Sequence, residues 1–426
     1  MKHAIALITF LGLIFAQMPA RQRMVVVISL DGFPAYALDD PKLPIPTLRQ
    51  LIHDGVSARM MTINPTVTWP NHTAMVTGVR ADEHGLLANG TIVQTGGWPP
   101  VKVEAMIDKE KMVHIPTVYD AAFKAGLSTA QVDWVAINRA PTITWGFNEW
   151  ASADGPVEQE MIGKGILTAA DLDKFTKSNI LFRDQTWTKA AVYLIREHKP
   201  NLLLVHFLSL DSTHHTYGPG SLAATDAIAF LDGCVAKITD AIRAAGMADR
   251  ATVIVVSDHG FKKFTKQVRP NVALDGAGLA KSVYVLPEGG SAYAYFDAAL
   301  APKVVKALDG IEGIDKIIGP ADFGSLGLPR QNRDPQMYQL LLTAKDGYSF
   351  SDAVGGPVTS EVRQQAGSHG YLASDPDMDA IFIASGYGVR AGARLDKIAN
   401  IDVASTIANL LGVRLPGSKG KPVPMQ

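Results

Sequence analysis

The sequence predicts an α/β fold, with a mostly parallel sheet flanked by helices. Three apolar runs have the composition of parallel strands that are buried on both faces: MVVVISL at 24–30, NLLLVHFLSL at 201–210 and ATVIVVS at 251–257. Helical patterns lie between or after these runs, at 46–55, 117–126, 186–198 and 226–246. Strands that alternate with helices form parallel sheets with right-handed crossovers.

The other segments complete one domain, which we expect to cover residues 21–426. Residues 262–365 mix short strand patterns with one helical pattern and many glycines. This mixture predicts a small α+β lobe at about 262–365, beside the sheet. The segment VASTIANLLG at 403–412 is expected to be a closing helix that packs on the sheet.

The first 20 residues have the pattern of a secretory signal peptide. A short basic start precedes the apolar run 4–16, and a candidate cleavage region follows at 17–20. The run is too short to span a bilayer comfortably. We therefore expect an exported protein, periplasmic or secreted, with a bacterial-like signal peptide and no membrane span in the mature chain. A retained N-terminal anchor is the alternative.

Cysteine content and charge exclude some classes of protein. Cys234 is the only cysteine, so an intramolecular disulfide and a cysteine-based zinc site are both excluded. Loss of residues 1–20, whose one formal charge is Lys2, takes the net charge from −1 to −2. Non-specific nucleic-acid binding needs a basic surface, so we expect no nucleic-acid partner.

An aspartate follows each predicted strand: Asp31, Asp211 and Asp258. In parallel sheets, ligands bind beyond the carboxyl ends of the strands, and these three side chains would meet at that edge. One such aspartate commonly starts a turn or caps a helix. Three unpaired carboxylates repel one another, however, and a bound cation is the simplest way to hold them together.

Three histidines lie where they could complete a metal site. His215 comes four residues after Asp211, His259 is adjacent to Asp258, and His369 lies between glycines in GSHGY. Oxygen and nitrogen ligands without thiolate suit zinc, with manganese or iron less favoured. Six ligands exceed the need of one tetrahedral ion, so we expect two ions, the usual arrangement for in-line displacement at phosphorus.

The stretch TVTWPNH at 66–72 raises two interpretations of Thr68. The residue could simply start a helix, because Pro70 suits the first helical position and Gly78 suits the end. It could also be a nucleophile, if a metal ion stabilises its alkoxide. A helix over 70–77 would direct its positive N-terminus toward the Thr68 oxygen and an incoming phosphate.

These motifs resemble the alkaline phosphatase superfamily, and more narrowly its type I phosphodiesterase and nucleotide pyrophosphatase family. The resemblance runs in order from about residue 24 to about residue 415, through Asp31, TWPNH, DSTHH with YGPG, DHGF and GSHGY. It implies a doubly wound α/β sheet and two Zn²⁺ ions. It also implies hydrolysis of phosphate diesters or pyrophosphates, with a small-molecule phosphate ester as substrate.

The resemblance further implies a role for each matching residue. Thr68 matches the nucleophile, which bridges toward one zinc and forms a phospho-threonine intermediate. Asn89 matches the residue that hydrogen-bonds a nonbridging phosphoryl oxygen, and Trp69 matches an aromatic that packs on the leaving group or base. The ligands of one zinc would be Asp211, His215 and His369, and those of the other Asp31, Asp258 and His259.

Two features leave the substrate open. His206 stands where nucleotide-selective members often carry a base-stacking tyrosine, so we expect this side chain to contact the substrate. Because the tyrosine is absent, the preference for nucleotides stays open. Arg139, in the segment 132–150, could contact a further phosphate oxygen and favour monoesters. The tryptophans of that segment could line the substrate pocket; these are Trp134, Trp145 and Trp150. A packed hairpin with a surface arginine is the alternative.

Two further functions stay open at this level. The first is phosphomonoester hydrolysis of the alkaline phosphatase type. The second is a non-catalytic metal-binding protein on the same scaffold, which would be expected to have lost a ligand or the nucleophile. The natural substrate and the oligomeric state cannot be read from the sequence.

Overall fold

The computed structural model describes residues 18–331 and 333–425. Residues 1–17, most of the predicted signal peptide, lie outside the described residues, so that prediction stays open. Within the described part of the chain, no helix combines the length and apolar character needed to cross a membrane.

An eight-stranded sheet forms the centre of the fold. Its strands run parallel to one another except β16, which is antiparallel to both of its neighbours. In order across the sheet they are β17 (Ala393–Ala399), β2 (Gly55–Met61), β16 (Ala380–Gly386), β8 (Ala251–Val256), β1 (Met24–Leu30), β7 (Leu202–Phe207), β5 (Thr129–Val132) and β6 (Trp145–Phe147).

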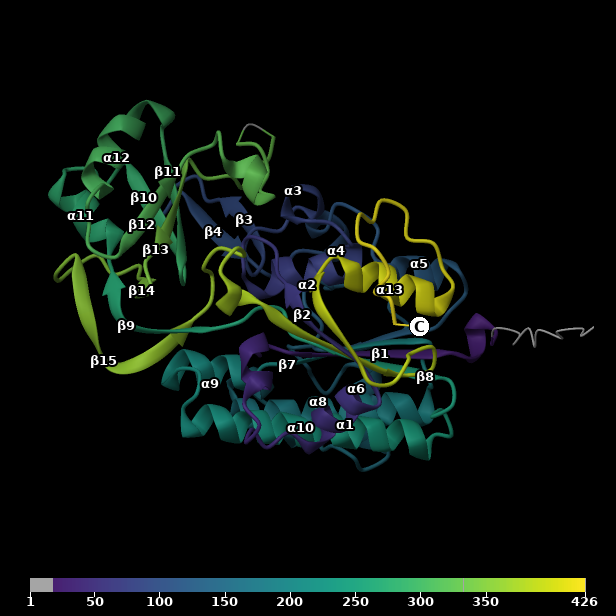
Figure 1. The fold of residues 1–426 in the computed structure, drawn as a ribbon. Helices are drawn as coiled ribbons and strands as arrows, with labels where there is room; N and C mark the ends of the chain where they lie inside the picture. Colours follow the sequence, from purple (N-terminus) through teal and green to yellow (C-terminus); the bar gives the residue numbers. More distant parts are fainter. Residues whose placement is uncertain (1–17, 332, 426) are drawn as a thin grey trace, which may run out of the picture.

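Helices cover both faces of this sheet, as Figure 1 shows. One layer consists of α1 (Pro46–His53), α6 (Pro156–Gly163), α8 (Ile180–Glu197) and α10 (Leu222–Ala244). The other consists of α2 (Thr68–Thr77), α5 (Val118–Lys124) and α13 (Asp402–Leu411). Short connecting helices are α3 (Ala81–His84), α4 (Lys109–Met112) and α7 (Ala169–Leu172). The predicted fold class is therefore confirmed.

Strand β1 explains why the predicted strands are apolar along their whole length. Met24, Val26 and Ile28 pack into the core under α8 and α10, whereas Val25 and Val27 pack into the core under α2 and α13. All five side chains are buried. Successive side chains of a strand point to opposite faces, so a strand covered on both faces has no solvent-facing position for a polar residue.

The chain between β8 and β16 forms a lobe of two small sheets. The four-stranded sheet contains β10 (Val283–Glu288), β11 (Ser291–Phe296), β13 (Leu340–Ala344) and β12 (Ile314–Ile318), and is covered by α11 (Pro270–Gly276) and α12 (Ala301–Leu308). The three-stranded sheet contains β14 (Gly347–Phe350), β9 (Lys262–Val268) and β15 (Thr359–Ser368). A separate hairpin, β3 (Thr91–Gln94) and β4 (Val101–Glu104), was not predicted.

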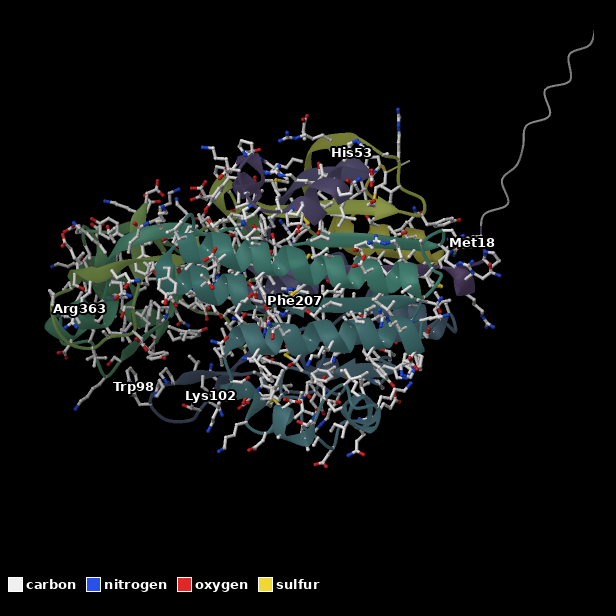
Figure 2. The ribbon with its side chains drawn as sticks, turned by 90° about the horizontal axis from the view of Figure 1, so that it is seen from below. Met18, His53, Trp98, Lys102, Phe207 and Arg363 are labelled. Atoms are coloured by element: carbon white, nitrogen blue, oxygen red, sulfur yellow. The ribbon has the colours of Figure 1, made fainter. Side chains whose placement is uncertain are left out.

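The carboxyl ends of the parallel strands point toward this lobe. Figure 2 shows Met18, which precedes β1, at one end of the molecule and Arg363 of β15 at the other, with Phe207 of β7 between them. The first and last strands of the lobe, β9 and β15, pair with each other, with Lys262 opposite Ser368. This pairing brings together the two chain segments on which the predicted histidine ligands lie.

The segment after β7 differs from the prediction. The apolar run predicts a strand to residue 210, but β7 ends at Phe207 and α9 (Ser209–Tyr217) follows. The buried carboxylate of Asp184 accepts hydrogen bonds from the backbone N–H groups of Leu208, at 3.1 Å, and Ser209, at 3.0 Å. These bonds satisfy N–H groups at the helix start, so the chain turns from strand to helix there.

Helix α9 packs closely on β15, and Gly367 permits this approach. A Cβ atom at Gly367 would lie 2.6 Å from the carbonyl oxygen of His214 in α9. Asp211 and His215 are four residues apart and therefore share one face of α9. The close packing of α9 on β15 brings this face near His369.

We expect Gly367→Ala to lower the free energy of unfolding by about 1–3 kcal/mol, because the added methyl group overpacks the α9–β15 contact. Gly233, inside α10, has open space around it and is the matched control. Gly233→Ala should stabilise the protein by about 0.5–1 kcal/mol through helix propensity. Urea denaturation measures both; equal effects of the two substitutions would contradict the packing argument.

Candidate active site

Six predicted ligands form two groups at the carboxyl edge of the sheet. The ligand atoms of each group lie within 4.8 Å of one another. The α9 group consists of Asp211, His215 and His369, and the β1 group consists of Asp31, Asp258 and His259.

The two groups are adjacent. In the β1 group, Nε2 of His259 lies 3.2 Å from Asp258 Oδ2 and 3.5 Å from Asp31 Oδ1. In the α9 group, Asp211 Oδ1 lies 3.4 Å and 3.9 Å from the Nε2 atoms of its two histidines. The rings of His259 and His369 stack with their centroids 3.8 Å apart, which links one group to the other.

The carboxylates of the two groups suit a bound cation. Asp31 Oδ1, Asp211 Oδ1 and Asp258 Oδ2 are buried and accept no hydrogen bond among the described residues. These are the oxygens that face the histidine Nε2 atoms. A buried, unpaired carboxylate oxygen is costly, so three of them pointing at imidazole nitrogens fit coordination of metal ions.

Two of the three histidines are held in the tautomer that a metal requires. His259 Nδ1 lies 3.1 Å from the carbonyl oxygen of Gly260, and His369 Nδ1 lies 3.0 Å from that of Thr66. A carbonyl only accepts, so Nδ1 carries the hydrogen and Nε2 keeps its lone pair for a metal. Burial also lowers the pKa of His259 to about 4 and that of His369 to about 3, which keeps both rings neutral.

Charge repulsion is strongest at Asp31. Burial, followed by the charges of Asp258 and Asp211, raises the pKa of Asp31 well above its usual range. Because the ionised form is disfavoured without a cation, the protein without metal carries a cost here that a bound ion would remove.

Thr68 lies in the first turn of α2, beside the β1 group. The sequence predicts a helix from Pro70, but α2 begins at Thr68 and follows Val67, so Pro70 is its third residue. The first N–H groups of a helix have no partner within it, so the missing N–H of a proline is tolerated at this position. The residue that precedes α2, Val67, makes no side-chain cap hydrogen bond to it. The Thr68 hydroxyl lies instead 3.4 Å from His259 Nε2.

Neighbouring side chains fix this turn. Asn71 accepts a hydrogen bond from the N–H of Ile63 and donates to the carbonyl oxygens of Pro65 and Val67. Nδ1 of the buried His72 lies 2.9 Å from the carbonyl oxygen of Thr68. Both side chains therefore support the first turn of α2 from within the loop and the helix.

Asn89 is oriented by the backbone of α2. Its Oδ1 accepts a hydrogen bond of 3.0 Å from the N–H of Trp69. Because that N–H can only donate, the Asn89 atom facing it is the carbonyl oxygen, and the amide NH₂ faces away. The side chain is exposed, so its NH₂ is available to a ligand next to Thr68.

A pocket of about 140 Å³ opens beside Trp69, the residue that follows Thr68. Seven of its ten lining residues are apolar or aromatic, and the walls come from the second residue of α2, from the loop after β4 and from the loops before and after β6. The lining residues are Trp69, Met106, residues 134–138, Asn148, Glu149 and Trp150. Trp145 is not among them; it packs on His198, with ring centroids 4.5 Å apart.

The expected substrate contact of His206 is wrong. Its side chain is 1% exposed and is enclosed by protein on all sides. Nε2 lies 2.9 Å from Asp31 Oδ2, and Nδ1 lies 3.1 Å from the carbonyl oxygen of Asp133. Burial opposes charge on this imidazole, but the bonds to Asp133 and Asp31 prevail and raise the pKa of His206 well above its usual range.

Arg139 is not brought into the pocket. Its side chain is 78% exposed and pairs with Asp108 at 3.3 Å, outside the residues that line the pocket. The alternative of a surface arginine therefore describes its position.

Sequence reasoning missed Asp133. It directly follows β5, and its side chain is buried against His206. The signal that identified Asp31, an aspartate at the carboxyl end of an apolar strand, also applies to Asp133, but β5 has only four residues and was not recognised as a strand.

The family model described as type I phosphodiesterase / nucleotide pyrophosphatase matches residues 25–372. The chain belongs to this family. Members are phosphoric ester hydrolases, and this type I phosphodiesterase is accordingly an enzyme of that class. The rat ectonucleotide pyrophosphatase/phosphodiesterase family member 7 is 23% identical over 95% of this chain and 87% of the relative. Mouse family member 1 is 25% identical over 91% of this chain, which spans 40% of that relative.

Solved structures share the fold of this phosphodiesterase. Murine ectonucleotide pyrophosphatase / phosphodiesterase 5 matches with a TM-score of 0.74 and 18% identity, over 94% of this chain and 98% of that one. An inactive form of the murine protein, with alanine in place of a threonine and AMP bound, matches with a TM-score of 0.73 and 18% identity, over 94% and 97% of the two chains.

We expect Asp31→Asn to raise the unfolding temperature of the metal-free protein and to lower it when zinc is bound. A carboxyl group whose pKa is raised on folding stabilises the protein below its ordinary pKa of about 3.8, and this stability is lost as the pH rises. In chelator at pH 8, the Asp31→Asn variant, which lacks this charge, should therefore unfold at a higher temperature than wild type. With saturating zinc the order should invert, because wild type gains more from metal binding.

Differential scanning calorimetry of both proteins in chelator and in zinc checks this expectation. Asp226→Asn, at an exposed carboxylate on α10, is the control and should shift neither midpoint. A lower midpoint for Asp31→Asn under both conditions would contradict the repulsion argument.

Proposed function

We propose that this enzyme hydrolyses phosphate diesters or pyrophosphates with two zinc ions and with Thr68 as the nucleophile. The α9 group would hold one ion and the β1 group the other. The observation that carries the proposal is the distance of 3.4 Å between Thr68 Oγ1 and His259 Nε2, the nitrogen that also faces Asp31 and Asp258.

In the first step, the Thr68 oxygen attacks phosphorus and the bond from phosphorus to the leaving oxygen breaks. The leaving oxygen departs with the electron pair, and the hydroxyl proton of Thr68 is lost to solvent. Bound zinc would supply the positive charge that stabilises the threonine alkoxide and the leaving oxygen. Water then attacks the phospho-threonine, the Oγ–phosphorus bond breaks, and Thr68 regains its proton.

The chain's own groups bind and orient the substrate. The N-terminal end of the ten-residue helix α2 favours a phosphate beside Thr68. The free NH₂ of Asn89 can donate to a nonbridging phosphoryl oxygen. Trp69, on the next residue of the same turn, can pack on the organic group that the pocket accepts.

The pocket favours a diester over a monoester. A monoester dianion has one more charged oxygen, and a nearby cationic side chain would stabilise it. The pocket lining contains no Lys or Arg among the described residues, and its one carboxylate, Glu149, pairs with Arg183 at 3.2 Å. The murine relative binds AMP, a nucleotide monoester, which supports nucleotide phosphate esters as candidate substrates or products.

Export of the enzyme remains part of the proposal. The pattern of residues 1–20 supports it, and so do the curated relatives, which are ectonucleotide enzymes by name. We infer that the mature enzyme acts outside the cytoplasm, in the periplasm or after secretion.

Thr68→Ala should lower the turnover of bis-p-nitrophenyl phosphate by about 10³-fold or more, because the nucleophile is removed. Thr68→Ser keeps a hydroxyl and should retain measurable turnover. Thr73→Ala, at a buried threonine of the same helix, is the control for packing and should stay close to wild type. Acid-quenched protein should carry a p-nitrophenyl phosphoryl group on the Thr68 peptide, because only one of the two ester groups of the substrate has left. Undiminished turnover by Thr68→Ala would exclude the mechanism.

Arg139→Ala should change kcat/KM for the diester and for p-nitrophenyl phosphate by less than about twofold, because an exposed ion pair contributes little. Arg243→Ala, at an exposed arginine that pairs with Asp240, is the matched control. A loss confined to p-nitrophenyl phosphate would instead favour the phosphomonoesterase alternative.

A further inference from the structure

His206 lies between two aspartates that follow neighbouring strands. Strand β7, which carries His206, is hydrogen-bonded to β1 on one side and β5 on the other. Asp31 is the residue after β1, and Asp133 is the residue after β5. The imidazole near the end of the middle strand is therefore in reach of both strand ends.

Both ring nitrogens of His206 face only acceptors. Nε2 lies 2.9 Å from Asp31 Oδ2, and Nδ1 lies 3.1 Å from the carbonyl oxygen and 3.3 Å from Oδ2 of Asp133. Both nitrogens are thus positioned to donate. The three side chains are each 2% exposed or less, so water cannot readily replace these contacts.

The contact with Asp31 determines which carboxylate oxygen faces the β1 group. His206 binds Oδ2, while Oδ1 lies 3.5 Å from His259 Nε2 and accepts no hydrogen bond among the described residues. A partner on one oxygen fixes the rotation of the carboxylate and so presents the other oxygen to a metal ion.

The contact with Asp133 reaches the wall of the pocket. Asp133 has a φ of +57°, an unfavourable backbone conformation for a residue with a side chain, and Ala136 in the same loop has a φ of +53°. Residues 134–138, which begin directly after Asp133, line the pocket. The strained conformation of the loop needs contacts that hold it, and His206 provides one at its first residue.

We propose that His206 is a positioning residue that joins the ligand Asp31 to the pocket-loop residue Asp133, so that one imidazole holds both the β1 group and the pocket wall. The inference rests on the proposed function, because it assumes that the β1 group binds zinc. It assigns to His206 no contact with substrate.

The test is a titration of metal-free protein with Zn²⁺ against a chromophoric chelator. Wild type should bind two ions, and Asp31→Asn identifies which affinity belongs to the β1 group. His206→Gln should weaken zinc binding by the β1 group by about 10–100-fold and leave the affinity of the α9 group unchanged. Asp133→Asn should weaken zinc binding by the β1 group to a smaller extent. His84→Gln is the control, since His84 is equally buried but hydrogen-bonds the N–H of Leu86 and no predicted ligand.

A kinetic measurement tests the second contact. At zinc concentrations that saturate the variants, His206→Gln and Asp133→Asn should still raise the KM for bis-p-nitrophenyl phosphate several-fold more than they lower kcat. Such a split is expected if the pocket wall has moved while the nucleophile and both ions are in place.

Several outcomes would overturn the inference. Two zinc affinities within twofold of wild type in His206→Gln would show that the histidine does not position Asp31, while leaving the proposed function intact. An equal loss of zinc affinity at the β1 group and the α9 group would show a general loss of structure and would contradict a specific role in positioning Asp31. If His206→Gln does not fold, Asp133→Asn decides by the same criterion. Wild type that binds fewer than two ions would instead overturn the proposed function, and this inference with it.

Discussion

Repulsion among three buried carboxylates is the constraint on which the rest of this structure depends. Asp31, Asp211 and Asp258 come from separate parts of the chain, and each leaves one oxygen without a hydrogen bond among the described residues. Burial makes the charge of Asp31 costly, and the proximity of Asp258 and Asp211 adds to that cost. A bound cation would offset the electrostatic cost of holding the three carboxylates together. The arrangement is therefore explained by metal binding and not by a contribution to the stability of the core.

The surrounding structure opposes this repulsion by holding each ligand from outside the site. Backbone carbonyls orient the rings of His259 and His369, and the backbone N–H of Gly32 donates to Asp258 Oδ1 at 3.1 Å. Asp184 starts α9 early enough to place Asp211 in its first turn. The rigid sheet and helices thus hold the ligands at the distances that ions need, before any ion binds.

Part of this could be predicted from the sequence, because the signals are local. Apolar runs identify strands buried on both faces, and aspartates after them identify the reactive edge. Asp211 was predicted as a metal ligand at the end of a strand, but it lies in the first turn of α9. The sequence of residues 208–210 is compatible with a longer strand, and the contact that starts the helix comes from Asp184, far away in the chain. The antiparallel direction of β16 is set by its pairing with β2 and β8, two distant segments of the chain, and hydrophobic periodicity does not encode such pairing.

His206 shows where local signals end. It stands where nucleotide-selective members of the family often carry a base-stacking tyrosine, which predicts a contact with substrate. Only the neighbouring strands β1 and β5 reveal that Asp31 and Asp133 enclose it. The order of strands in a sheet is set by packing between distant segments, so no spacing along the chain predicts this contact.

The pairing of β9 with β15 has a consequence for how the enzyme can diversify. Both junctions of the lobe are fixed beside the ligands, with Lys262 opposite Ser368. A one-residue insertion in either strand would turn successive side chains to the opposite face and displace a histidine. Insertions farther out in the lobe would leave the junctions unchanged. The lobe can therefore acquire or lose segments, and with them new substrate preferences, while the chemistry at its base is inherited without alteration.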